Sequence, residues 1–361
     1  MVELVDTLVS GTSAFTGMEV RVFFRAHYYE KSSHKEHKGT KITKEEMKKT
    51  ILTLIVLAAL LIGFGGCKPK NAVTRNMDGK LNVTTTNFPP FDFVRNIAGD
   101  KVNLFMLLPP GAESHSFEPS PKDIITIQNS GIFIYGGGEG DIWVDRILES
   151  MNTSKMIIVR MMDAVDVVEE EIVEGMEAEE EEEEETAYDE HVWTSPRNAI
   201  LIVVAITEAL CKADSVNAEF YRQNAATYSK ELVKIDAAFN DIVAGAKRKT
   251  IVFADRFPFR YFADAYGLTY FAAFPGCSTD TEPSAGTVAF LINKIKAEKI
   301  PVVFHIELSN EMMADTISGE TGARKLLFHA CHNISKKDFD AGLGYLDLMR
   351  GNVENLREAL R

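Results

Sequence analysis

The sequence has few cysteines, no excess of basic charge and no common zinc-hydrolase motif. Four cysteines among 361 residues cannot form the disulfide framework that stabilises small secreted domains. Lysine and arginine number 39 against 53 aspartate and glutamate, a net charge of −14, whereas nucleic-acid binding needs clustered basic side chains. The HExxH motif does not occur in the chain. These absences argue against a disulfide-built domain, a nucleic-acid-binding protein and a hydrolase of that class.

The chain contains enough apolar residues for about two folded units, with 45% hydrophobic residues over its length. One apolar run, Ile51–Ile62, has twelve residues, which as a helix would be about 18 Å long, too short for a bilayer core of about 30 Å. Lys48 and Lys49 precede this run, and small residues follow it up to Cys67. A basic start, a short apolar stretch and small residues before a cleavage point are typical of a secretory signal.

The end of this signal resembles a bacterial lipobox, so we expect a lipid on Cys67. The signal peptide would then occupy residues 47–66 and a lipidated tether residues 67–80. Residues 1–46 precede the natural start of the signal at Met47, and we interpret them as an over-extended gene start. The mature protein would be anchored by lipid at the extracytoplasmic face of the bacterial cell membrane.

Strands and helices alternate after the tether. The pattern predicts an α/β fold of two lobes, each a mostly parallel sheet flanked by helices. Apolar residues recur every three or four positions across 217–246, which predicts one long, rigid helix between the lobes. The expected organisation is a metal-binding N-terminal lobe, the linking helix and a C-terminal lobe, at residues 81–214, 215–246 and 247–361.

A glutamate-rich segment interrupts the first lobe at residues 169–190, and seven consecutive glutamates form Glu179–Glu185. Such a run repels itself and stays solvated. We expect an inserted acidic loop, which either is merely solvated or gathers cations weakly.

Five histidines follow Cys67, and each lies at the end of a predicted strand or in the loop after it. They are His115, His191, His305, His329 and His332. In open parallel sheets, ligands bind beyond the carboxyl ends of the strands. Neutral imidazole is a preferred ligand of Zn²⁺ and other late first-row metals. Several loop imidazoles therefore predict a transition-metal site.

Two of these histidines lie in recognisable motifs. The segments 111–121 (GAESHSFEPSP) and 189–199 (DEHVWTSPRNA) resemble the first two metal-ligand motifs of the ZnuA/TroA-type solute-binding lipoproteins of zinc and manganese ABC importers. The resemblance extends from Leu81 to the C-terminus. It implies a metal held in a cleft between two lobes, with His115 and His191 as ligands, and delivery of that metal to a membrane permease.

The sequence departs from the family pattern at the other two ligands. Arg256 stands where the third ligand is expected, and arginine cannot bind a metal. The neighbouring Asp255 is therefore a candidate ligand, and Arg256 itself is a candidate anion contact. The family's last ligand is an aspartate. In its place we favour His329, with three further candidates at His305, His332 and Glu307.

Ligation dominated by histidine favours Zn²⁺, and more oxygen ligands would favour Mn²⁺. We therefore expect a monomeric binding protein of a metal ABC importer and not an enzyme. The alternatives are a lipoprotein adhesin, an extracytoplasmic zinc hydrolase, and a relative that binds an anion or chelate through Arg256. Cys277 and Cys331 are expected either to form a disulfide or to remain as thiols or soft ligands.

Overall fold

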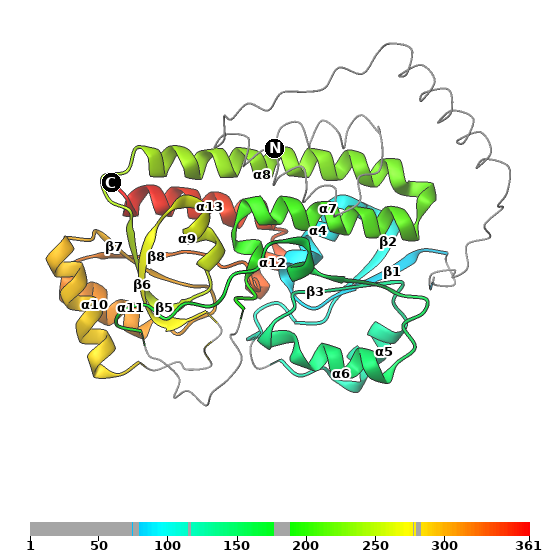
Figure 1. Ribbon diagram of the computed structural model, residues 1–361, viewed down its shortest axis with the longest axis horizontal. Coiled ribbons are helices and arrows are strands. Elements are labelled where there is room, and N and C mark those ends of the chain that lie inside the picture. Colours follow the sequence, from blue (N-terminus) through cyan, green and yellow to red (C-terminus); the bar gives the residue numbers. More distant parts are fainter. Residues whose placement is uncertain (1–73, 75–78, 115–116, 177–187, 277, 279–282) are drawn as a thin grey trace, which may run out of the picture. The chain divides into compact units, whose positions relative to one another are not determined.

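The computed structural model (Figure 1) describes residues 74, 79–114, 117–176, 188–276, 278 and 283–361. These residues contain two four-stranded sheets in which all neighbouring strands are parallel. The first sheet has the order β2-β1-β3-β4, with strands Leu81–Thr85 (β1), Val102–Met106 (β2), Ile132–Tyr135 (β3) and Ile157–Arg160 (β4). The second has the order β6-β5-β7-β8, with strands Thr250–Phe257 (β5), Thr269–Pro275 (β6), Val302–His305 (β7) and Arg324–Leu327 (β8).

Helices cover both sheets, as expected for parallel strands that are apolar on both faces. Every residue of β1 and of β3 is buried. The helices that accompany the first sheet are Phe88–Ala98 (α4), Pro121–Gln128 (α5), Ile142–Ser150 (α6) and Pro196–Ala213 (α7). Those around the second are Arg260–Tyr266 (α9), Ala285–Glu298 (α10), Met312–Thr321 (α11), Lys336–Asp340 (α12) and Tyr345–Ala359 (α13).

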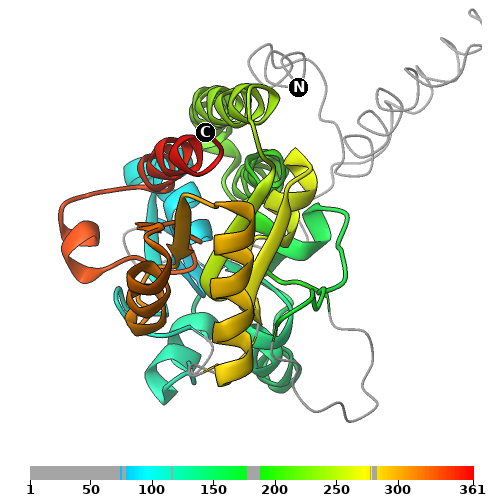
Figure 2. The same cartoon turned by 90° about the vertical axis from the view of Figure 1, so that its left-hand side faces the viewer.

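One long helix, Ala218–Ala244 (α8), lies in sequence between the two sheets and has 27 residues. At 1.5 Å per residue it is about 40 Å long. It packs against α4 and α7 of the first lobe and against α13 of the second part of the chain. Figures 1 and 2 show α8 and α13 side by side above the sheets. The predicted fold class, two α/β lobes connected by one long helix, is confirmed.

The residue pattern predicts a helix from Phe91, after a break at Pro89 and Pro90, and a last helix from Val353. Helix α4 instead begins at Phe88. Pro89 and Pro90 occupy its first turn, where backbone N–H groups have no partner within the helix, so proline fits there. Helix α13 begins at Tyr345 rather than Val353. Strand β4 and helices α6 and α12 were not expected from the sequence.

The last segment of the chain contacts the first lobe as well as the second. The Tyr345 hydroxyl donates to the Trp193 carbonyl (2.6 Å), and the Tyr345 backbone N–H donates to Asp92 (2.9 Å). Both partners belong to the part of the chain that carries the first sheet. The start of α13 therefore connects the two lobes directly. No helix among the described residues is long and apolar enough to cross a membrane, and the run Ile51–Ile62 lies outside them.

Candidate metal centre

Three side chains meet where loops from the two lobes come together. Glu190, His191 and His332 offer ligand atoms that all lie within 4.8 Å of one another. The His191 and His332 rings are 5.2 Å apart between centroids and nearly perpendicular, at 82°. His191 is fully buried and Glu190 is 3% exposed. Two imidazoles and a carboxylate in this arrangement are typical ligands of a divalent transition metal.

The carboxylate of Asp189 orients His191. It accepts a hydrogen bond from the His191 backbone N–H (2.7 Å) and lies 3.1 Å from the ring Nδ1. A carboxylate on Nδ1 fixes the ring orientation and directs metal binding to Nε2. Burial favours the neutral ring, but the neighbouring carboxylates of Asp189, Glu190 and Glu170 together outweigh it, so the pKa of His191 is raised.

Glycines surround the carboxylate of Glu190. The Gly140 N–H donates to Oε2 of Glu190 (2.7 Å). A Cβ at Gly138 would lie 2.5 Å from the Glu190 Cβ, and one at Gly140 would lie 2.7 Å from Oε1. A side chain at either position would force Glu190 to move, so the glycines of the loop after β3 leave the space that Glu190 occupies. Burial raises the pKa of Glu190 to about 7.

Glu307 positions the loop that carries His332. One oxygen of its carboxylate accepts from the His332 backbone N–H (3.0 Å), and the other accepts from the Ala330 N–H (2.6 Å). Between them, Cys331 has a φ of 61°, in the left-handed region that residues other than glycine rarely adopt. This turn and the Glu307 carboxylate together present His332 to the cluster.

Here the structure differs from the sequence-based preference for His329. Its Nδ1 accepts a hydrogen bond from the Cys331 N–H (2.9 Å), and its backbone N–H donates to Asn352 (2.7 Å). Burial lowers the pKa of His329, so the ring is neutral despite lying 3.4 Å from Glu307. His329 thus stabilises the turn, while His332 joins His191 and Glu190.

The other second-lobe candidates also lie outside this cluster. Asp255 accepts hydrogen bonds from the backbone N–H groups of Arg256 (2.9 Å) and Ile306 (3.1 Å), and burial raises its pKa. These hydrogen bonds connect the end of β5 to the loop after β7. The Nδ1 atom of His305 lies 3.1 Å from the carbonyl of Ile306. Asp255 and His305 therefore make hydrogen-bonding contacts with the backbone, and neither belongs to the cluster of Glu190, His191 and His332.

Arg256 lines the same cavity as His191 and His332. Its guanidinium is paired with Glu113, at 3.3 and 3.4 Å, and donates to the Ser278 carbonyl (3.3 Å). The ion pair joins the loop after β2 to the end of β5. The guanidinium thus already has an anionic partner from the protein.

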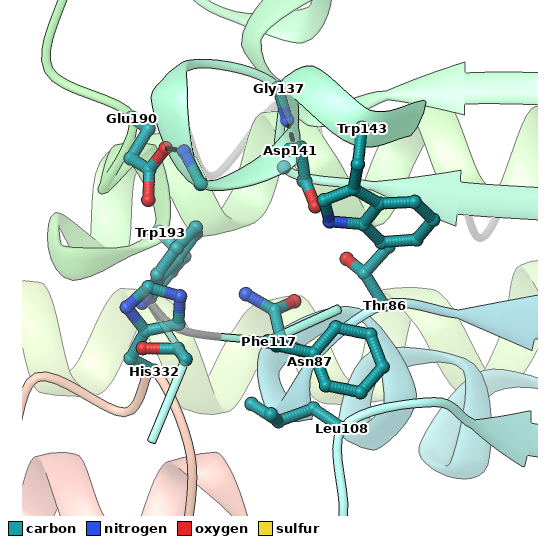
Figure 3. Close-up of a pocket in the computed structure, with 13 residues that line it drawn as sticks. Thr86, Asn87, Leu108, Phe117, Gly137, Asp141, Trp143, Glu190, Trp193 and His332 are labelled. Carbon is teal, nitrogen blue, oxygen red and sulfur yellow. Dashed lines mark hydrogen bonds between the residues drawn. The ribbon is translucent and has the colours of Figure 1, made fainter. Parts of the chain in front are cut away.

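A second small cavity adjoins the cluster (Figure 3). Glu190, His332 and Ser114 line it, and Ser114 and His332 also line the cavity that holds Arg256. Ser114 is the residue before His115. The structure therefore brings the start of the first metal-ligand motif next to the second.

Several predicted residues lie outside the described part of the chain: His115, Cys67, Cys277 and the glutamate run. Cys331 is described, and it is a free, fully buried cysteine rather than a disulfide partner. Glu190 is the cluster residue that sequence reasoning did not select. The sequence feature that could have indicated its position is the set of glycines at 136–138 and 140. Glycines leave space for a side chain from another loop, and Glu190 occupies the space beside Gly138 and Gly140.

Comparisons with known proteins agree with the fold. The family model ZnuA, described as "Zinc-uptake complex component A periplasmic", matches residues 83–359. The high-affinity zinc uptake system protein ZnuA of Bacillus subtilis is 32% identical over 315 residues, covering 85% of this chain and 97% of that protein. The zinc-binding lipoprotein AdcA of Streptococcus pneumoniae (strain R6) is 32% identical over 313 residues, covering 86% of this chain and 61% of AdcA.

Solved structures give the same result. The Zn(II)-bound ZnuA-like domain of S. pneumoniae AdcA superposes with a TM-score of 0.66 at 30% identity, covering 78% of this chain and 99% of that one. The metal-dependent lipoprotein YcdH from B. subtilis superposes with a TM-score of 0.67 at 31% identity, covering 78% and 100%. The chain, with its two parallel sheets and the histidine–carboxylate cluster between their loops, belongs to the ZnuA family of zinc-uptake components.

Proposed function

We propose that this protein is the substrate-binding component of a zinc ABC importer, which captures Zn²⁺ and delivers it to a membrane permease. The observation that carries the proposal is the convergence of Glu190, His191 and His332 within 4.8 Å. The names of relatives at 32% identity, a zinc uptake system protein and a zinc-binding lipoprotein, support it. They favour a carrier over an adhesin or an enzyme.

The proposed ligand set is two imidazoles and one carboxylate from described residues, completed by His115. Ser114, the neighbour of His115, lines both cavities beside the cluster. Four protein ligands would leave no open position for a metal-bound water, which a hydrolytic zinc site requires. Such a closed site suits carriage, and its imidazoles favour Zn²⁺ over Mn²⁺.

The proposal also covers the location of the protein in the cell and its oligomeric state. We propose that the protein is a monomer and that a lipid on Cys67 holds it at the extracytoplasmic face of the membrane, within reach of its permease. The segment before Cys67, with its basic start and short apolar run, supports this location. Mass spectrometry of the membrane fraction tests it through the presence of a diacylglyceryl group on Cys67.

The binding site is tested with a matched pair of histidine variants. Isothermal titration of the metal-free full chain with Zn²⁺ should give one tight site. The His332→Ala variant should lose affinity by about 100-fold or more, as expected when a coordinating imidazole is removed. The His329→Ala variant should retain zinc affinity within about tenfold. Equal losses in both variants, or no zinc binding by the wild-type chain, would overturn the proposed site.

A further inference from the structure

The cavity in Figure 3 extends from the metal centre toward the carboxyl end of β1, where it meets two buried polar residues. Thr86 is 4% exposed and Asn87 is 6% exposed. Their oxygens, Oγ1 and Oδ1, have no hydrogen-bond partner in the described structure. In Figure 3 both side chains point into the cavity. Buried polar atoms are normally paired, and exceptions need an explanation such as a bound ion or water.

Two carboxylates face these oxygens across the cavity, those of Asp141 and Glu190 (Figure 3). Each is oriented by a backbone N–H of the glycine loop: Gly137 donates to Asp141 (3.1 Å) and Gly140 donates to Glu190 (2.7 Å). No lysine or arginine occurs among the described residues that line this cavity. The walls therefore combine two acidic groups with a hydroxyl and an amide, and they favour a cation.

The dimensions and the shielding suit one small ion. The cavity has a volume of about 20 Å³, which is enough for a single ion or water molecule. Phe117 and Trp143 pack edge to face, with 5.9 Å between their ring centroids, and both line the cavity. Apolar rings at the wall lower the local dielectric and strengthen the attraction between a cation and the carboxylates.

We infer that this cavity is a second, oxygen-lined cation subsite for a hard divalent ion of the Mn²⁺ type, next to the proposed zinc centre. Carboxylate, amide and hydroxyl oxygens suit Mn²⁺ and Mg²⁺, whereas imidazoles suit Zn²⁺. The subsite shares the Glu190 carboxylate with the zinc centre, so occupancy of one affects affinity at the other, and the effect is reciprocal. Thr86, Asn87 and Asp141 line this cavity but do not belong to the zinc cluster, so substitutions at these residues test the subsite separately from zinc capture.

The test is a titration of the zinc-loaded full chain with Mn²⁺, followed by loss of the electron paramagnetic resonance signal of free Mn²⁺. We expect one Mn²⁺ to bind per chain without release of zinc. The Asn87→Ala and Asp141→Asn variants should weaken Mn²⁺ binding by about tenfold or more, because ligand number and charge set affinity at such sites. The Asn87→Asp variant should strengthen it, since it adds a carboxylate. Asp163→Asn, at an exposed acid outside the cavity, is the matched control and should change nothing.

The controls separate this inference from zinc capture and from surface binding. Zinc content is measured in every variant, so a misfolded variant is recognised by its loss of zinc. If the wild type and Asp141→Asn bind Mn²⁺ equally well, the ion binds at the acidic surface and not in the cavity, and the inference is overturned. The inference is also overturned if Mn²⁺ replaces zinc in a one-to-one ratio, or if the zinc-loaded chain binds no Mn²⁺. A chain that binds Mn²⁺ in the cavity but no zinc would retain the inference and refute the proposed function.

Discussion

Glu307 is the residue whose substitution best tests how the metal centre is held together. Its carboxylate accepts hydrogen bonds from the backbone N–H groups of Ala330 and His332, at 2.6 and 3.0 Å. The Glu307→Gln substitution keeps the side-chain shape but removes the negative charge and turns one acceptor into a donor. One of the two backbone N–H groups is then left without an acceptor. The change acts on the turn that presents His332, and it leaves His332 itself intact.

The expected loss follows from the two hydrogen bonds. A hydrogen bond to a charged group contributes about 1.5–3 kcal/mol, and a buried donor without a partner costs about 1–3 kcal/mol. We expect the free energy of unfolding of the metal-free chain to fall by about 2–3 kcal/mol. At about 2–4 °C per kcal/mol for a chain of comparable size, Tm falls by about 4–12 °C. Zinc affinity should fall by about 10- to 100-fold, as for other groups that orient a ligand.

The assay is a pair of measurements on the metal-free chain: urea or thermal unfolding, and zinc competition against a chromophoric chelator. Glu311→Gln is the control, because Glu311 forms a surface ion pair with Lys325 (2.7 Å), which contributes only about 0–1 kcal/mol. Loss of zinc affinity without any loss of metal-free stability would refute the reasoning, because it would make Glu307 a direct ligand. Unchanged stability and unchanged affinity would refute it as well.

Three further predictions concern the glycine loop, pH and the contact between the lobes. Gly140→Ala places a Cβ 2.7 Å from Oε1 of Glu190, so zinc affinity should fall by about tenfold or more. Gly319→Ala, where a Cβ meets nothing within 4 Å, is its control in zinc titrations. The pKa values of Glu190 (about 7) and His191 are raised, and both groups must be deprotonated to bind metal. Zinc affinity should therefore fall as pH drops through about 7, with uptake of more than one proton per zinc released. Calorimetry in buffers of different ionisation enthalpy measures that uptake, and a pH-independent affinity down to about pH 5.5 would contradict it. Tyr345→Phe removes the hydroxyl that donates to the Trp193 carbonyl and should lower the free energy of unfolding by about 1–2 kcal/mol in urea titrations. A change no larger than that of Tyr188→Phe, at an exposed tyrosine, would show that this contact adds no stability.

The sequence predicts the architecture well because strand and helix periods are local properties. The β-branched and apolar stretches around Leu81, Val102 and Thr250 predict parallel strands, and the strands lie there. The spacing of apolar residues in α8 predicts a long helix, and Tyr221, Leu232 and Phe239 are fully buried. Helix starts were less accurate, since Pro89 and Pro90 are compatible both with a break and with a first helical turn.

The details of the site depend on contacts that the sequence does not reveal. The choice between His329 and His332 depends on the left-handed turn at Cys331, which is rare for a residue other than glycine. The place of Glu190 depends on Gly138 and Gly140 from another loop. The pairing of Arg256 with Glu113 joins residues 143 positions apart. Each of these is a tertiary contact, and single-sequence patterns report mainly on neighbours within a helix or strand.

The hydrogen bonds of Asn333 have a consequence for the rate at which a cargo ion leaves. The Asn333 side-chain amide donates to the carbonyls of Pro109 and Ala112, at 2.9 and 2.8 Å, and the Gly111 N–H donates to Ile334 (2.8 Å). These three bonds tie the loops of the two lobes together beside the cluster. If an ion leaves the cluster past these loops, the three bonds must open first, so we expect spontaneous escape to be slow and strongly temperature-dependent. A permease that competes for these same backbone groups would shorten the residence time of the ion without any large rotation of the lobes.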